Sequence, residues 1–126
     1  MSKESTPKLF EYAACSTCRK AKKWLDAHGV GYTSIPIVES PPKLAELTRL
    51  VERSGLPIDR WFNTSGGSYR DLIARIGKPK FAAMSQAEKV RLLAADGKMI
   101  KRPVLVDDAR VLVGFDEAKY RALDSR

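Results

Sequence analysis

Residues 8–38 carry the pattern that most restricts how this chain can fold. Residues 8–13 (KLFEYA) are short and partly alternating, which predicts a strand. From residue 16 to residue 28 the apolar positions fall on one face of a helix, and Gly29 supplies its end. Residues 32–38 (YTSIPIV) predict a second strand. A strand, a helix and a strand of this total length are typical of a βαβ unit with two parallel strands.

Residues 40–97 carry helix and loop signals. Ser40 is a suitable N-cap, a proline follows it at the first helical position, and together they predict a helix that stops at Gly55. The capping box Ser85–Glu88 (SQAE) predicts another helix that runs through Ala95, with a glycine after it. We therefore expect this part of the chain to be a helical segment between two groups of strands.

The last part of the chain returns to strand signals. Residues 103–106 and 111–113 are rich in Val and Leu and are separated by a short polar segment, which predicts a β-hairpin. Asp116 then caps a closing helix. The full order is βαβ, helices, ββα, which predicts an α/β fold with a mixed β-sheet core and a helical insertion.

Length and composition suit one soluble domain. The chain has 126 residues, of which 44% are hydrophobic, and we expect residues 1–39 and 98–126 to form the core and residues 40–97 the insertion. No stretch is long and apolar enough for a membrane span and the N-terminus is polar, so we expect a cytoplasmic location without membrane contact. The net charge of +8 attracts anions. The basic residues are spread along the chain without a nucleic-acid-binding motif, so direct nucleic-acid binding is not expected.

Cys15 and Cys18 form a CxxC pair at the predicted turn between the first strand and the first helix. A zinc site needs three or four ligands, and the chain has only two cysteines and one histidine, so no metal site is predicted. A disulfide that closes so short a loop stabilises a fold little. Side chains three residues apart in a helical turn lie about 5 to 6 Å apart, which a reversible disulfide accepts. The pair therefore favours redox chemistry, with two inert thiols as the alternative.

The order of the two cysteines predicts their roles. Cys15 precedes the helix, where unpaired backbone N–H groups favour a negative charge, and Arg19 and Lys20 add positive charge nearby. A lowered pKa makes a thiol a better nucleophile at neutral pH. Cys18 lies three residues before Ala21 and should lean toward the buried face. We predict that Cys15 is the nucleophile and Cys18 the resolving thiol, and we include Arg19 in the binding site.

Three separated segments, in this order, add to the pattern: YAACSTCRKAKKWLDAHGVGY, WFNTSGGSYRDL and MIKRPVLVDDARVLVGFDEAKY. Together they resemble the arsenate-reductase-like family, which contains the ArsC reductases, the Spx and MgsR regulators, and the YusI and YffB proteins. The resemblance covers nearly the whole chain. It implies a thioredoxin-like fold with a helical insertion and a redox nucleophile at the first cysteine.

The resemblance also implies roles outside the cysteine pair. Arg102 is expected to face Cys15 as an anion-binding group for arsenate, a carboxylate of glutathione or a substrate thiolate. Pro103 is expected to follow a cis peptide bond and to shape the binding groove. The loop before the second helical stretch either lines the cleft or only shapes the chain, and its residues are Asn63, Thr64, Ser65 and Gly66.

The chain departs from the arsenate reductases in two respects. Glutaredoxin-linked reductases place two further arginines around the nucleophile, where this chain has Asn63 and Gly114, with Arg60 and Arg110 nearby as candidates to replace them. Those enzymes also have a single cysteine in the first motif. We therefore expect a glutaredoxin-like thiol-disulfide oxidoreductase without a tightly bound cofactor, reduced by glutathione, a glutaredoxin or a thioredoxin. The alternatives are an arsenate reductase and an Spx-type redox-sensing regulator that binds RNA polymerase.

Overall fold

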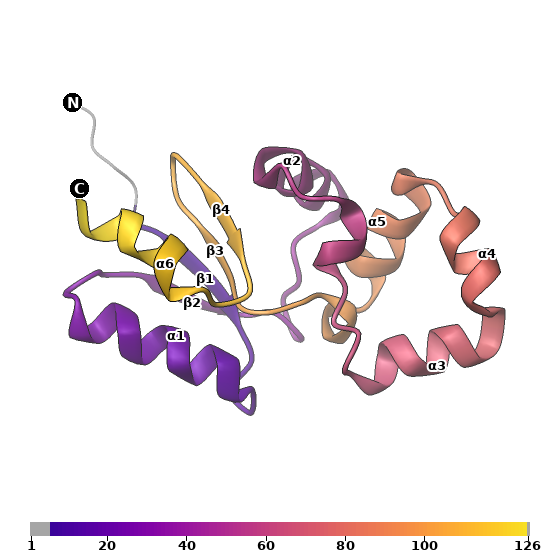
Figure 1. Cartoon of the computed structure of the whole chain (residues 1–126), viewed down its shortest axis with the longest axis horizontal. Coiled ribbons are helices and arrows are strands. Elements are labelled where there is room, and N and C mark those ends of the chain that lie inside the picture. Colours follow the sequence, from indigo (N-terminus) through magenta and orange to yellow (C-terminus); the bar gives the residue numbers. More distant parts are fainter. Residues whose placement is uncertain (1–5, 126) are drawn as a thin grey trace. The chain divides into compact units, whose positions relative to one another are not determined.

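The computed structural model describes residues 6–125, with side chains as far as residue 123. The chain forms two compact units. Residues 37–101 make one, which we call the helical unit; the segments up to residue 36 and from residue 102 make the other, which we call the sheet unit. In Figure 1 the sheet unit contains the arrows and the helices α1 and α6, and the helical unit contains α2 to α5.

The described part of the sheet unit contains a mixed sheet of four strands in the order β2-β1-β3-β4. Strand β1 is parallel to β2 and antiparallel to β3, and β3 is antiparallel to β4. The elements are β1 (Lys8–Glu11), α1 (Ser16–Ala27), β2 (Thr33–Pro36), β3 (Val104–Val106), β4 (Val111–Val113), α6 (Glu117–Tyr120) and a 3-10 helix (Arg121–Ser125). The predicted fold class, a βαβ unit and a ββα unit joined by a helical insertion, is confirmed.

The core of the sheet unit lies on the face of the sheet that α1 and α6 cover. The register places Leu9, Leu105 and Leu112 side by side on β1, β3 and β4. The first two are fully buried. The other buried members of this cluster are Ala21, Trp24, Leu25, Tyr120 and Leu123. Because side chains alternate along a strand, Glu11 lies on the same face of β1 as Leu9 and points toward α1.

The ends of the helices in this unit follow the predicted signals. Helix α1 is followed by Gly29 with a φ of 67°, a left-handed conformation that glycine adopts without a steric penalty. The side chain of Asp116 accepts the backbone N–H of Ala118 at 3.0 Å and so caps α6. Pro36 ends β2, an edge strand, where its missing N–H removes no bond from the interior of the sheet.

One predicted boundary in the helical unit is wrong. Ser40 does not cap a helix, because α2 begins at Leu44 after the N-cap Lys43. A proline disfavours helical geometry in the residue before it, so Pro42 keeps Pro41 out of the helix. The elements of this unit are α2 (Leu44–Ser54), a 3-10 helix (Ile58–Trp61), α3 (Gly67–Ile76), α4 (Lys78–Ala83), α5 (Gln86–Ala95) and a second 3-10 helix (Gly97–Met99).

Helix α5 has the predicted capping box. The Ser85 hydroxyl accepts the N–H of Glu88 at 3.1 Å, and the Glu88 carboxylate accepts the N–H of Ser85 at 2.8 Å. Gly97, expected to end this helix, begins the 3-10 helix that follows. A Cβ at position 97 would lie 2.1 Å from the carbonyl oxygen of Ile37. The glycine is therefore required by a close approach of two backbone segments and not by a helix end.

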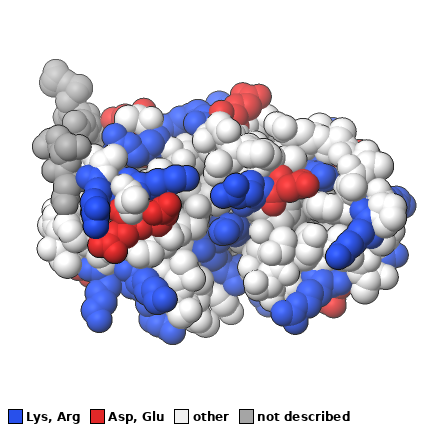
Figure 2. Space-filling view, in the orientation of Figure 1, with Lys and Arg blue, Asp and Glu red and all other residues white. Residues whose placement is uncertain are grey.

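Charged side chains lie mostly on the surface. Figure 2 shows Lys and Arg spread over the face that it draws, with Asp and Glu among them. Lys89 is an exception: it is buried in the helical unit, with Nζ 2.8 Å from Asp59 Oδ1 and 4.4 Å from the centre of the Phe81 ring. None of the helices in the described part of the chain is long and apolar enough to cross a bilayer.

The buried hydroxyl of Tyr120 allows a test of packing in the sheet unit. Its ring meets Trp24 and Phe115 edge to face, and its hydroxyl has no hydrogen-bond partner among the described residues. We expect Tyr120→Phe to keep the free energy of unfolding or raise it by up to about 1 kcal/mol, because an unsatisfied polar group is removed. Tyr120→Leu should lower it by about 1 to 3 kcal/mol, because aromatic contacts are lost and a cavity forms. Urea denaturation measures both, and a clearly destabilised Tyr120→Phe variant would contradict this account.

Candidate functional site

The two cysteines lie where β1 leads into α1. Strand β1 ends at Glu11, and α1 begins at Ser16. In the turn between them the backbone N–H of Cys15 donates to the carbonyl of Tyr12 at 3.0 Å. The strand-to-helix turn predicted from the sequence is therefore present, and it places Cys15 at the N-terminus of the helix.

Cys15 is the N-cap of α1. Its backbone is extended, with φ −89° and ψ 121°. Its sulfur accepts a hydrogen bond from the backbone N–H of Cys18 at 3.3 Å. The N–H groups in the first turn of a helix have no carbonyl partner within the helix, so they can donate to a thiolate instead. The side chain is partly exposed and is therefore accessible to a substrate.

The surroundings of Cys15 lower the pKa of its thiol. Partial burial acts in the opposite direction, but it is outweighed by hydrogen bonds from the side chain and backbone of Cys18, by the positive charge of Arg102, and by the backbone N–H of Thr17. Arg19 and Lys20, which were expected to add positive charge, are not among the causes of this shift, and the guanidinium of Arg19 donates to the carbonyl of Ala13 at 3.2 Å. The part of Arg19 in substrate binding stays a prediction. The charge that acts on the sulfur comes from Arg102, which lies far away in the sequence.

Cys18 has the opposite environment. The residue is fully buried. The pKa of its thiol is raised to about 12, first by burial and then by the hydrogen bond to Cys15 and the negative charges of the Cys15 thiolate and of Glu11. A backbone hydrogen bond from Tyr12 acts in the opposite direction. Cys18 therefore stays protonated at neutral pH and donates to the sulfur of Cys15.

Arg102 and Pro103 immediately precede β3. The peptide bond between them is cis, as the family resemblance implies. The carbonyl of Pro103 accepts the N–H of Gly114 at 2.8 Å, which ties this segment to the end of β4. The guanidinium carbon of Arg102 lies 4.8 Å from the centre of the Tyr12 ring, within the turn that carries Cys15. The ring thus supports the arginine whose charge acts on the nucleophile.

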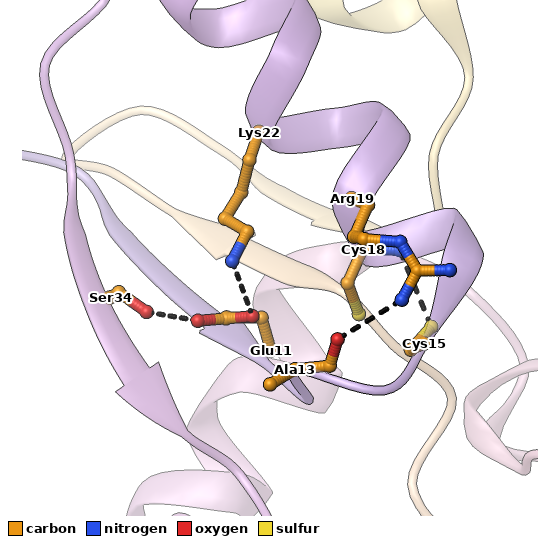
Figure 3. A network of polar contacts seen from close by, with 7 residues as sticks. All are labelled: Glu11, Ala13, Cys15, Cys18, Arg19, Lys22 and Ser34. Atoms are coloured by element: carbon orange, nitrogen blue, oxygen red, sulfur yellow. Dashed lines mark hydrogen bonds and ion pairs between the residues drawn. The ribbon is translucent and has the colours of Figure 1, made fainter.

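Sequence reasoning missed a polar cluster next to the cysteines (Figure 3). One carboxylate oxygen of Glu11 lies 3.2 Å from Lys22 Nζ, and the other accepts a hydrogen bond from the hydroxyl of Ser34 in β2. The side chain of Glu11 is only 11% exposed. The available signal was its place two residues after the buried Leu9, on the face of β1 that meets α1.

The four predicted loop residues belong to the helical unit, where they form the turn before α3. The N–H of Asn63 donates to the carbonyl of Met99 at 2.8 Å, and the N–H of Gly66 donates to the carbonyl of Asn63 at 3.2 Å. Gly66 is the N-cap of α3. Thr64 and Ser65 are exposed, while the other two are half-buried. Their part in substrate binding stays a prediction.

The chemistry available at the site is that of two thiols. Both cysteines are free, one accessible and one buried. Within residues 6–125 no group of three or more His, Cys, Asp or Glu side chains is placed to hold a metal ion. A thiolate of lowered pKa can attack a disulfide sulfur, and a second thiol three residues away can attack the mixed disulfide that results.

Comparison with known proteins decides the family. The model of the ArsC family matches residues 10–123, which is nearly the whole chain. The chain belongs to the ArsC family. The resemblance carried by the three sequence segments is thereby confirmed.

Relatives of this ArsC family protein cover it almost completely. The uncharacterized protein YusI of Bacillus subtilis is 49% identical over 112 residues, which are 89% of this chain and 92% of YusI. The global transcriptional regulator Spx 2 of Bacillus cereus is 28% identical over 113 residues, or 90% of this chain and 82% of Spx 2. The crystal structure of a possible arsenate reductase from Streptococcus mutans UA159 matches with a TM-score of 0.82 and 40% identity, covering 95% of this chain and 98% of that chain. The fold of the ArsC family protein is therefore thioredoxin-like, as predicted.

Alkylation tests the charge that acts on Cys15. The thiolate is the reactive form, so the rate of reaction with iodoacetamide should rise with pH through the pKa of Cys15 and then level off. Because this pKa is lowered, the rise should occur at a lower pH than for an ordinary cysteine. Arg102→Met should move the rise to a higher pH, because the positive charge is lost. Mass spectrometry of alkylated Cys15 at a series of pH values measures the shift.

A matched arginine provides the control. Arg110 lies in the turn between β3 and β4, where its guanidinium is 3.4 Å from the Asp107 carboxylate, and it is not among the groups that act on Cys15. Arg110→Met should therefore leave the alkylation profile unchanged. If Arg102→Met also leaves it unchanged, the assigned role of Arg102 is wrong.

Proposed function

We propose that this protein is a glutaredoxin-like thiol-disulfide oxidoreductase. The observation that supports this most is the opposite shift of two thiol pKa values within one helical turn: that of Cys15 is lowered, and that of Cys18 is raised to about 12. A reaction that proceeds through a mixed disulfide needs one accessible thiolate to begin it and one protected thiol to finish it. Cys15 and Cys18 have these two properties.

The reaction has two steps. First, the Cys15 thiolate attacks one sulfur of a substrate disulfide, the substrate S–S bond breaks, and the other sulfur leaves as a thiolate that takes up a proton. Next, Cys18 loses its proton and attacks the Cys15 sulfur. The mixed disulfide breaks, and the second substrate sulfur leaves with the electron pair. The substrate has then gained two electrons, and the protein holds a Cys15–Cys18 disulfide.

Glutathione fits this scheme as part of a mixed-disulfide substrate and as the reductant. The planar guanidinium of Arg102 would bind a glutathione carboxylate or a leaving thiolate, since this group pairs well with planar anions. Pro103 would shape the backbone of the groove next to it. Two molecules of glutathione, or a glutaredoxin or thioredoxin, would return the pair to the dithiol form, and the scheme needs no tightly bound cofactor.

A redox titration in glutathione buffers tests this function. Wild type should form a Cys15–Cys18 disulfide, and Cys18→Ser should instead accumulate glutathione on Cys15, because the resolving thiol is missing. Cys15→Ser should stay unmodified, because Cys18 is buried and protonated. Mass spectrometry of quenched samples distinguishes the products. Thiols that stay reduced in wild type until strongly oxidising conditions would reject the proposal.

Arsenate reduction is a second candidate, favoured by the match to the structure from Streptococcus mutans. Two positions count against it, because the arsenate reductases are expected to have further arginines where this chain has Asn63 and Gly114. Gly114 has a φ of 80°, a conformation that is strained for arginine, and Arg110 is already paired with Asp107. Arg102 would then have to balance most of the charge of a tetrahedral dianion by itself. We therefore place arsenate reduction below disulfide exchange.

A redox-switched regulator is the candidate from another class, and similarity to Spx 2 favours it. In this case a Cys15–Cys18 disulfide would alter the first turn of α1 and with it a surface that binds RNA polymerase. Purified RNA polymerase should then be retained by only one of the dithiol and disulfide forms, and Cys18→Ser, which cannot form the bond, should behave like the dithiol under both conditions. Retention by neither form would reject this candidate.

A further inference from the structure

Tyr12 contacts both the nucleophile and the arginine that acts on it. It lies between the end of β1 at Glu11 and the start of α1. Its backbone carbonyl accepts the N–H of Cys15 at 3.0 Å. Its side chain is half-buried, and the centre of its ring lies 4.8 Å from the guanidinium carbon of Arg102. The residue therefore joins the turn that carries Cys15 to the segment that carries Arg102.

The pairing of β1 with β3 explains why these two side chains meet. The two strands are antiparallel, and Phe10 lies opposite Val104. Continued by two residues, the same register places Tyr12 opposite Arg102. Residues that lie opposite each other in an antiparallel pair present their side chains on the same face and interact there. The contact is therefore a consequence of strand pairing within the sheet unit, to which both residues belong.

An aromatic ring is suited to hold an arginine beside a binding site. The π electrons of the ring attract the guanidinium, and this attraction needs no hydrogen-bond acceptor, so N–H groups of the arginine remain able to donate to an anion. An arginine side chain has several rotatable bonds, and affinity is lost when such a side chain is ordered only on binding. Because Tyr12 orders Arg102 beforehand, less affinity is lost. An aliphatic side chain at position 12 would not attract the charge.

We propose that Tyr12 is a positioning residue that holds Arg102 for a carboxylate of the substrate, an inference that rests on the proposed oxidoreductase function. The protein should then react preferentially with disulfides that carry a carboxylate close to the S–S bond. The carboxylate binds the guanidinium while the Cys15 thiolate attacks the nearer sulfur. A bond forms from Cys15 to that sulfur, the S–S bond breaks, and the other sulfur leaves with the electron pair and takes up a proton.

Two disulfides with the same skeleton measure this preference. At neutral pH 3,3′-dithiodipropionic acid carries two carboxylates, and 3,3′-dithiodipropionamide carries neutral amides in their place. Each is added in excess to the fully reduced protein at pH 7 and constant ionic strength, and mass spectrometry of quenched samples follows the loss of reduced protein. The ratio of the two second-order rate constants, diacid over diamide, reports the carboxylate contact. A change in the thiolate fraction of Cys15 alters both rate constants equally and cancels in the ratio.

Substitutions at the two positions should change this ratio in a linked way. Tyr12→Leu should lower it about threefold, because the cation–π contact is lost, whereas Tyr12→Phe, which keeps the ring, should leave it unchanged. Arg102→Met should lower the ratio about tenfold, because the charge that binds the carboxylate is removed. In the Arg102→Met protein, Tyr12→Leu should have no further effect on the ratio, because a residue that acts through Arg102 then has nothing to position.

Matched variants control for general effects of each substitution. Tyr32→Leu makes the same change at a half-buried tyrosine that packs against the core of the sheet unit, and it should leave the ratio unchanged. Arg110→Met removes one positive charge from the same unit, so it measures the general attraction of a basic protein for an anion and should lower the ratio less than about twofold. Tyr12→Gln is a second non-aromatic variant and should behave like Tyr12→Leu.

The failure of this inference differs from the failure of the proposed function. If Arg102→Met lowers the ratio but Tyr12→Leu and Tyr12→Gln do not, the role of Tyr12 is overturned while the oxidoreductase function stands. A loss in Tyr12→Phe, or an additional loss in the double variant, would also overturn a role that acts through the ring and Arg102. A ratio that Arg102→Met leaves unchanged would overturn the preference for a carboxylate. If neither disulfide oxidises the wild-type thiols to a Cys15–Cys18 bond, the proposed function itself fails.

Discussion

At the N-terminus of α1 a sulfur atom takes the place of the carbonyl oxygen that a backbone N–H would otherwise need. The sulfur is that of Cys15, and the N–H is that of Cys18, at 3.3 Å. The same contact therefore caps the helix, sets the spacing of the thiol pair and stabilises the charged form of the nucleophile. It requires an extended backbone at Cys15, which the turn after β1 provides. A change that moved the start of α1 by one residue would alter all of these properties together.

The two thiols differ in pKa because one lies near the surface and the other is buried in the core. Cys15 is partly exposed and receives backbone N–H groups together with the charge of Arg102. Cys18, one helical turn further on, points into the same interior as Trp24 and Leu25, where its charged form is poorly solvated. Identical side chains thus acquire different reactivities because one helical turn carries the chain from a polar rim to a packed core.

Glu11 shows what it takes to keep a carboxylate next to that core. An isolated buried carboxylate is costly, and its charge is tolerated here because Lys22 and Ser34 both contact it. An apolar side chain would fill this position on the face of β1 with no need for partners. The carboxylate of Glu11 is therefore held in place by one ion pair and one hydrogen bond.

Much of the fold could be predicted because the signals are local. The capping box before α5, the glycine after α1 and the alternating strands act over a few residues, and each was found where it was expected. The errors occurred where a neighbour overrides a local preference. Pro42 moved the start of α2. Helix α5 ends at Ala95 as predicted, but the glycine that follows it is explained by a backbone contact between Gly97 and Ile37.

Local patterns in the sequence are enough to predict the order of the elements, the place of the cysteines at the turn from strand to helix, and their division into an outer and an inner thiol. Helix ends, side-chain alternation and i, i+3 spacing are properties of short segments. Which charges act on the two sulfurs depends instead on contacts between segments that are distant in the sequence. Strand pairing brings Arg102, at the start of β3, to the turn that carries Cys15, and the packing of α1 on β1 brings Glu11 next to Lys22. No local pattern contains these contacts, because electrostatic interactions depend on distance in space and not on distance along the chain.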